Sequence, residues 1–148
     1  MKILVISDTH GDVYAINKVL LRESGVDLYL HAGDVVAPKR NINPFAAVRG
    51  NCEGYFRQEY DESYEYLTPF GKIHMEHIPL SDIRIEALKL EGVRIFIHGH
   101  THVREAIKDG DSYIFCPGSI SHPRDNEVGT YLVLEITEKE VKYTFKEI

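Results

Sequence analysis

Three features are scarce in this 148-residue chain: cysteine, positive charge and long apolar stretches. The two cysteines, Cys52 and Cys116, are too few for a disulfide scaffold and fit a reducing compartment. Lysine and arginine total 17 against 23 acidic residues, and the formal charge of −6 argues against binding to long nucleic acids. The opening "MKILVISDTH" has too short an apolar run for a signal or membrane segment. We therefore expect a cytoplasmic protein with no membrane partner.

The chain also lacks an internal repeat, a low-complexity tract and a linker, so we expect a single domain over residues 1–148. Helical spacing of apolar residues predicts helices at about 13–23 and 80–90, and at most a short helix between 35 and 48. Short apolar runs predict strands at 2–7, 26–31, 46–51, 64–70, 73–77, 93–98, 103–108, 112–116, 129–136 and 140–147. A βαβ order followed by antiparallel strands predicts an α/β (α+β) fold, with two packed sheets and helices outside.

Polar residues follow several of these strands at the point where each strand ends. The segments are "SDTHG", "HAGD", "RGNCE", "HMEHIP" and "HGHTH". Ligands of open α/β sheets collect beyond the carboxyl ends of the strands. In extended backbone residues i and i+2 share a side, so Asp8 and His10 can face one point, as can His100 and His102. Glycines in these segments are expected to turn the backbone so that the next side chain points inward: Gly33, Gly50 and Gly99.

Together these segments offer a set of side chains that suit a metal centre. The candidates are Asp8, His10, Asp34, Asn51, His77, His100 and His102. Carboxylate, imidazole and amide without an obligatory thiolate favour Mn²⁺, with Zn²⁺, Fe, Ni or Mg²⁺ as alternatives. The set exceeds the roughly four to six positions of one ion, whereas two ions that share a carboxylate would use it fully. Two ions about 3.5–4 Å apart activate water near neutral pH and hold the attacking and leaving oxygens at phosphorus.

Four of these motifs occur in a fixed order: "SDTHG", "GD" at 33–34, "GN" at 50–51 and "GHTH" at 99–102. In this the chain resembles the calcineurin-like metallophosphoesterases, and most closely their small prokaryotic single-domain phosphodiesterase branch. "CPGSISHPR" is similar to the "NPGS" loop of that branch, so the resemblance runs over nearly the whole chain. It implies a four-layer αββα sandwich of two mixed sheets, and a metal-dependent phosphoesterase that attacks with a bridging hydroxide. By the same resemblance Asp8, His10 and His102 would hold the first ion, Asn51, His77 and His100 the second, and Asp34 would bridge them.

His77 has a competitor for its place in this set. The resembling families have His-Gly there, whereas this chain has His77 followed by Ile78. His74, three residues earlier, would point to the opposite side of an extended strand. The strand-end position and the family spacing favour His77.

The largest departure from the family is Cys52, in "GNCE". Many catalytic members have a histidine at this position that protonates the leaving oxygen, and a thiol is a poor substitute. Loss of a general acid costs about 10²–10⁴ in rate, mainly for poor leaving groups. We therefore expect the highest activity on aryl or otherwise activated phosphodiesters.

Four further residues lie within or beside these motifs. Arg124 is the loop arginine that we expect to contact phosphate, together with Asn51, because a guanidinium matches the phosphate fork; the alternative is a solvated side chain. His122 could reach the mouth of the site, while His31 and His98 are expected to pack or to orient ligands. The expected partner is a small phosphate ester or nucleotide, and a homo-oligomer is possible. The alternative function is a catalytically weak, metal-binding scaffold of the same fold; a repair nuclease is disfavoured because the chain is short and acidic.

Overall fold

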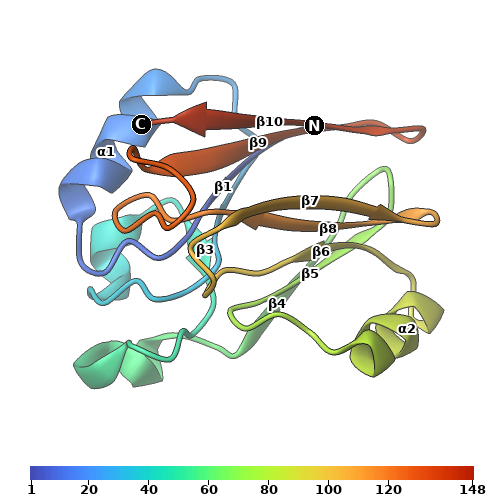
Figure 1. Cartoon of the computed structure of the whole chain (residues 1–148), viewed down its shortest axis with the longest axis horizontal. Helices are drawn as coiled ribbons and strands as arrows, with labels where there is room; N and C mark the ends of the chain where they lie inside the picture. The colour runs from blue at the N-terminus through green and yellow to red at the C-terminus, as the bar shows by residue number, and fades with distance from the viewer.

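The computed structural model describes residues 1–148 and contains two β-sheets stacked face to face (Figure 1). The first sheet has the strand order β10-β9-β1-β2-β3. Its strands are β1 (Lys2–Ile6), β2 (Leu28–His31), β3 (Ala46–Ala47), β9 (Thr130–Ile136) and β10 (Val141–Glu147). The second sheet has the order β4-β5-β6-β8-β7. Its strands are β4 (Ser63–Leu67), β5 (Lys72–Glu76), β6 (Val93–Ile97), β7 (Arg104–Asp109) and β8 (Ser112–Pro117).

Both sheets are mixed, and each contains three adjacent parallel strands. β1, β2 and β3 run parallel, β9 pairs antiparallel with β1, and β10 pairs antiparallel with β9. In the second sheet β5, β6 and β8 run parallel, while β4 and β7 are antiparallel edge strands. The carboxyl ends of the parallel strands therefore open on a common edge in each sheet, where ligands bind in α/β folds.

Helices cover the outer faces of the two sheets. α1 (Val13–Arg22) begins because the Asp12 side chain accepts the Ala15 N–H, and its apolar stripe packs on the first sheet. α2 (Asp82–Leu90) begins at Ser81 and packs through Ile85 on the second sheet. Two short 3₁₀ turns, η1 (Lys39–Ile42) and η2 (Gly54–Glu59), complete the set. This arrangement is the expected four-layer αββα sandwich.

The main core lies between the sheets. Val5, Leu30, Met75, Ile97 and Leu132 belong to it, and none is more than 2% exposed. The other face of β1 packs against α1, so this strand is buried on both sides. A strand with two buried faces has a continuous apolar run rather than an alternating pattern, as residues 3–6 of β1 do.

The elements follow the sequence prediction with small differences. The helix from Val13 and the strands after residue 93 lie within a few residues of their expected limits. The third strand is only two residues long, and η2 was not predicted because its aromatic and polar residues show no helical spacing. Neither helix has the length and apolar character required to cross a lipid bilayer.

Candidate metal centre

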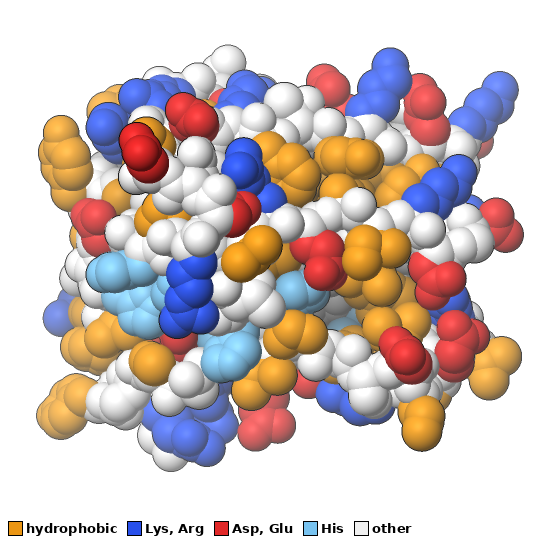
Figure 2. All heavy atoms as spheres, in the orientation of Figure 1, with side chains coloured by type: hydrophobic (Ala, Val, Ile, Leu, Met, Phe, Trp, Pro, Cys, Tyr) orange, Lys and Arg blue, Asp and Glu red, His pale blue; other side chains and the backbone are white.

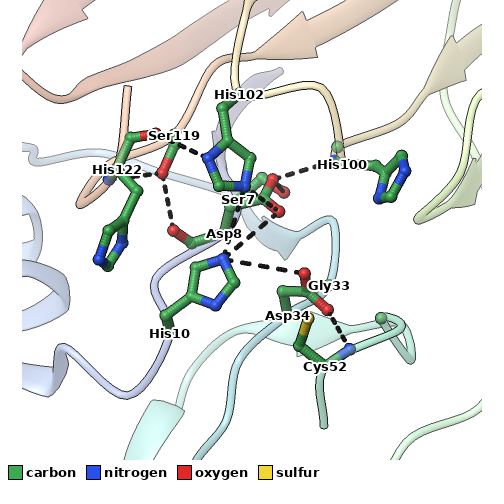
Figure 3. A network of polar contacts seen from close by, with 12 residues as sticks. Ser7, Asp8, His10, Gly33, Asp34, Cys52, His100, His102, Ser119 and His122 are labelled. Carbon is green, nitrogen blue, oxygen red and sulfur yellow. Dashed lines mark hydrogen bonds and ion pairs between the residues drawn. The ribbon is translucent and has the colours of Figure 1, made fainter. Parts of the chain in front are cut away.

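The loops at the carboxyl ends of the parallel strands bring all of the predicted ligands to one place. Figure 3 shows five of them: Asp8, His10, Asp34, His100 and His102. Asp8 and His10 follow β1, Asp34 follows β2, and Asn51 follows β3. His77 follows β5, and His100 and His102 follow β6. The site thus lies between the two sheets, and each sheet contributes part of the ligand set.

One group of donor atoms surrounds His10. The Oδ1 atom of Asp8 lies 3.2 Å from His102 Nε2 and 4.0 Å from His10 Nε2. The two imidazole Nε2 atoms are 3.5 Å apart. These separations are those of ligands that share one ion, and the three residues are the set expected for the first metal.

A second group of donor atoms surrounds Asn51. Its Oδ1 lies 2.9 Å from His77 Nε2 and 3.1 Å from His100 Nδ1. Asp34 stands between the two groups, because its Oδ2 is 3.3 Å from His77 Nε2 and 3.8 Å from His10 Nε2. The carboxylate of Asp34 is therefore in the position that a bridging ligand requires.

The hydrogen bonds of the rings leave lone pairs that face one another. His102 Nδ1–H donates to the His122 carbonyl at 2.6 Å, and His77 Nδ1–H donates to the Ala32 carbonyl at 2.7 Å. In a neutral ring Nε2 then carries a lone pair, which in His102 faces Asp8. In His77 the Nε2 atom faces Asn51 and Asp34, and a bound cation would take the place of the proton that it shares with Asp34. Asp8 Oδ1 is fully buried and has no hydrogen-bond donor. A buried acceptor without a donor is costly, and a cation between these atoms satisfies them together.

The electrostatics of the site favour the charged form of Asp34. Burial on its own raises the pKa of Asp34, but hydrogen bonds from His77 and from the Cys52 N–H outweigh burial and lower this pKa to about 2. Burial lowers the pKa of His10, against the opposing effect of Asp34 and Asp8. Burial also acts to lower the pKa of His77, yet its hydrogen bond to Asp34 and the nearby carboxylates raise it overall.

Most of the ligand residues have left-handed backbone conformations. The φ angles are 54° at Asp8, 47° at His10, 55° at Asp34, 71° at His100 and 59° at His102. Only one other non-glycine residue, Val36, has a positive φ. This corrects the expectation of extended backbone at Asp-x-His and His-x-His: the side chains do meet, but through strained turns. Such strain concentrates at functional sites, where the surrounding structure maintains it.

The glycines beside the ligands have a role different from the expected one. Gly50 and Gly99 do not have a positive φ; instead their Cα atoms contact ligands so closely that a side chain has no room. A Cβ on Gly50 would lie 2.0 Å from Asp34 Oδ1, and one on Gly99 would lie 2.8 Å from Asp8 Oδ2. Gly33 does turn the chain, with a φ of +99°, as expected.

Two supporting residues escaped the sequence analysis. Glu53 is 2% exposed, and its carboxylate accepts the N–H groups of Val36 and Gly50 at 2.8 Å each, so it ties two ligand loops together. Ser119 donates its hydroxyl to the Asp8 carbonyl at 2.8 Å and accepts the His122 N–H at 2.8 Å. The signal for each was a polar or acidic residue at the end of a motif, in "GNCE" for Glu53 and in "PGS" for Ser119.

The remaining histidines lie outside the donor groups. His74 is on the outer face of the second sheet, where its ring nitrogens contact Glu65 at 2.7 Å and Glu76 at 2.6 Å. His31 is completely buried, which lowers its pKa to about 3, and its ring contacts the Thr9 hydroxyl at 2.9 Å. His98 contacts the Gly99 carbonyl at 2.9 Å. The geometry thus places His77, and not His74, beside the other predicted ligands.

The site opens to solvent on two sides. One opening is lined by His10, His102, His122 and Arg124, and the Arg124 guanidinium makes only a long 3.4 Å contact with the Thr101 carbonyl. The other opening is lined by residues that include Arg49, Asn51, Arg57 and His77. Figure 2 shows histidine side chains gathered on this face with basic side chains beside them.

Comparison with known proteins agrees with this geometry. The model of the calcineurin-like phosphoesterase superfamily domain matches residues 1–139. The probable metallophosphoesterase YsnB of Bacillus subtilis is 31% identical over 92% of this chain and 85% of its own. The phosphodiesterase YfcE of Escherichia coli is 28% identical over 91% of this chain and 88% of its own.

Solved structures extend the comparison. A conserved uncharacterized protein of Streptococcus pneumoniae, described as a predicted phosphoesterase, has a TM-score of 0.83 and 30% identity, over 99% of this chain and 88% of that one. Vacuolar protein sorting 29 of Cryptosporidium parvum shares the fold, with a TM-score of 0.71 at 14% identity, over 99% of this chain and 97% of that one. Fold, motif order and matched length agree, and the chain belongs to the calcineurin-like phosphoesterase superfamily.

Proposed function

We propose that the chain is a phosphodiesterase that binds two divalent metal ions and hydrolyses small phosphodiesters or nucleotides. The observation that carries this proposal is the buried Asp8 Oδ1, which has no hydrogen-bond donor and lies 3.2 Å from His102 Nε2, within the convergent cluster of carboxylate, imidazole and amide donor atoms. Two bound ions would supply an activated hydroxide for in-line attack at phosphorus and would offset the charge of the phosphate oxygens. Mn²⁺ suits the oxygen and imidazole donors.

The residues of the chain prepare the site before substrate arrives. The carbonyls of Ala32 and His122 hold two imidazoles so that Nε2 points inward. The low pKa of Asp34 keeps its carboxylate charged at neutral pH. Arg124 lies at one opening, where its guanidinium has one long contact with the Thr101 carbonyl and can donate to two oxygens of a phosphate.

The two openings of the site favour a phosphodiester as the substrate over a phosphomonoester. A diester carries a substituent on each side of phosphorus, and this site has an exit on each side, with Arg124 at one and Arg57 at the other. A relative of similar length, YfcE, is named a phosphodiesterase.

Cys52 determines which leaving groups suit the site. Burial and the nearby carboxylate of Asp34 raise the pKa of its thiol, so the thiol is a weak proton donor at neutral pH. Leaving groups that need no protonation, such as aryl oxides, should therefore depart fastest.

The test is hydrolysis of an aryl phosphodiester by metal-stripped protein, before and after addition of Mn²⁺. His100→Ala removes a ligand beside Asn51, and His74→Gln is the matched control because His74 lies on the outer face of the second sheet. Turnover that requires Mn²⁺, is lost in His100→Ala and persists in His74→Gln supports the proposal. Binding of two ions per chain without turnover of any diester would contradict it and favour a scaffold function.

A further inference from the structure

The thiol of Cys52 lies against the metal-ligand groups rather than away from them. Its Sγ and the donor atoms of His10 and Asp34 are all within 4.8 Å of one another. The Cys52 N–H donates to Asp34 Oδ1 at 2.8 Å, and its Sγ accepts a 3.4 Å hydrogen bond from Asn51 Nδ2. Figure 3 shows the sulfur beside the Asp34 carboxylate, at the end of the site where His10 lies. Backbone and side-chain contacts thus hold the thiol at the site.

A second observation places a cation next to this thiol. Asp8 Oδ1 is buried without a donor and lies 4.0 Å from His10 Nε2. His10 belongs both to the group formed with Asp8 and His102 and to the group formed with Asp34 and Cys52. An ion held by His10 has Asp8 and Cys52 as flanking donors.

We infer that Cys52 is an additional ligand of the ion at His10 and Asp34 whenever that ion is thiophilic, as Zn²⁺, Co²⁺ and Cd²⁺ are. This inference rests on the proposed metal site, because His10 and Asp34 belong to both. When such an ion binds, a metal–sulfur bond forms and the thiol proton passes to solvent. With Mn²⁺, which prefers oxygen donors, the thiol remains protonated and does not coordinate the ion.

The separations are compatible with this coordination. Zn–S and Zn–N bonds of about 2.3 Å and 2.0 Å at a tetrahedral angle place the two ligand atoms about 3.5 Å apart. The donor atoms of Cys52, His10 and Asp34 lie within 4.8 Å of one another, so coordination requires the sulfur to move by about 1 Å at most. Cys52 is exposed, so its side chain is free to make this movement.

The experiment adds Co²⁺ to the metal-stripped full chain and records its absorption spectrum. Visible ligand-field bands report that the ion is bound, and a near-ultraviolet sulfur-to-cobalt band reports a thiolate ligand. We expect both in the natural chain, and only the visible bands in Cys52→Ser. Cys116→Ala is the matched control, because Cys116 is a buried thiol with no place in the metal-ligand groups, and it should retain both.

Affinity provides a second readout. Loss of the thiolate should weaken Cd²⁺ binding at least about tenfold in Cys52→Ser, while Mn²⁺ affinity changes little. Visible bands without the near-ultraviolet band, or an identical near-ultraviolet band in Cys52→Ser, would overturn the role of Cys52 and leave the metal site standing. The absence of visible bands from the natural chain would overturn both the inference and the proposed function.

Discussion

Gly50→Ala should damage the metal site from a position that is not a ligand. The added Cβ would lie 2.0 Å from Asp34 Oδ1 and 2.2 Å from the Asp34 backbone nitrogen, whereas ordinary contact begins at 3.4 Å. A side-chain rotation cannot relieve a clash with backbone, so the Asp34 loop has to retreat by about 1 Å or more.

Two consequences follow from this displacement. Overpacking of a well-packed region costs about 1–3 kcal/mol of unfolding free energy. Misplacement of a shared ligand by about 1 Å should lower turnover about 10²-fold, and metal affinity should fall by about 10–100-fold. Urea unfolding measures the first effect, and titration of the metal-stripped protein with Mn²⁺ measures the second.

Gly54→Ala is the matched control, four residues along the same loop. Its Cβ would meet nothing within 4 Å, but its φ of +55° is unfavourable for alanine. We expect a stability loss of about 1 kcal/mol with unchanged Mn²⁺ affinity. The close-approach argument is refuted if Gly50→Ala binds Mn²⁺ as tightly as the natural chain does.

Three further predictions concern single carboxylates and the thiol. Glu53→Gln replaces a buried carboxylate that accepts three backbone N–H groups, so urea melts should show a loss of about 1.5–3 kcal/mol, together with weaker Mn²⁺ binding. Cys52→His introduces a proton donor, and kinetics on paired substrates should show up to about 10²-fold faster alkyl-diester hydrolysis with little gain on aryl diesters. Burial acts to raise the pKa of Glu76, but its contacts with Arg84 and His74 outweigh burial and lower it. The Glu76 carboxylate therefore contributes its full stabilisation of the folded state above the unfolded pKa of about 4.3. This stabilisation is lost as the pH falls through the lower pKa of the folded state. Glu76→Gln should flatten this acid dependence in urea melts taken between about pH 6 and about pH 3.

The layers of the fold could be predicted from the sequence, because the positions of apolar residues along the chain reflect which faces of an element are buried. Residues 3–6 of β1 are all apolar because this strand is covered on both faces. The apolar stripe of α1 and its N-cap residue Asp12 are both visible in the sequence. β3 was harder to delimit, because a two-residue edge strand makes few ladder contacts and leaves little pattern.

The candidate site was accessible through side-chain chemistry but not through backbone geometry. Aspartate and histidine at strand ends signalled ligands, yet nothing local indicated a positive φ at Asp8 or His100. The close approach of Gly99 to Asp8 joins loops more than 90 residues apart, and so does the His100 N–H bond to Asp8 Oδ2. Contacts of this kind form only when the two sheets pack together, so a short segment of sequence cannot predict them.

The division of ligands between the sheets has a consequence for folding kinetics. Asp8, His10, Asp34 and Asn51 belong to loops of one sheet, and His77, His100 and His102 to loops of the other. An ion bound by both sets would fasten the sheets together at one edge, and the complete set exists only after the sheets have docked. Bound metal should therefore slow unfolding while refolding proceeds at nearly the same rate, as expected for contacts formed after the transition state.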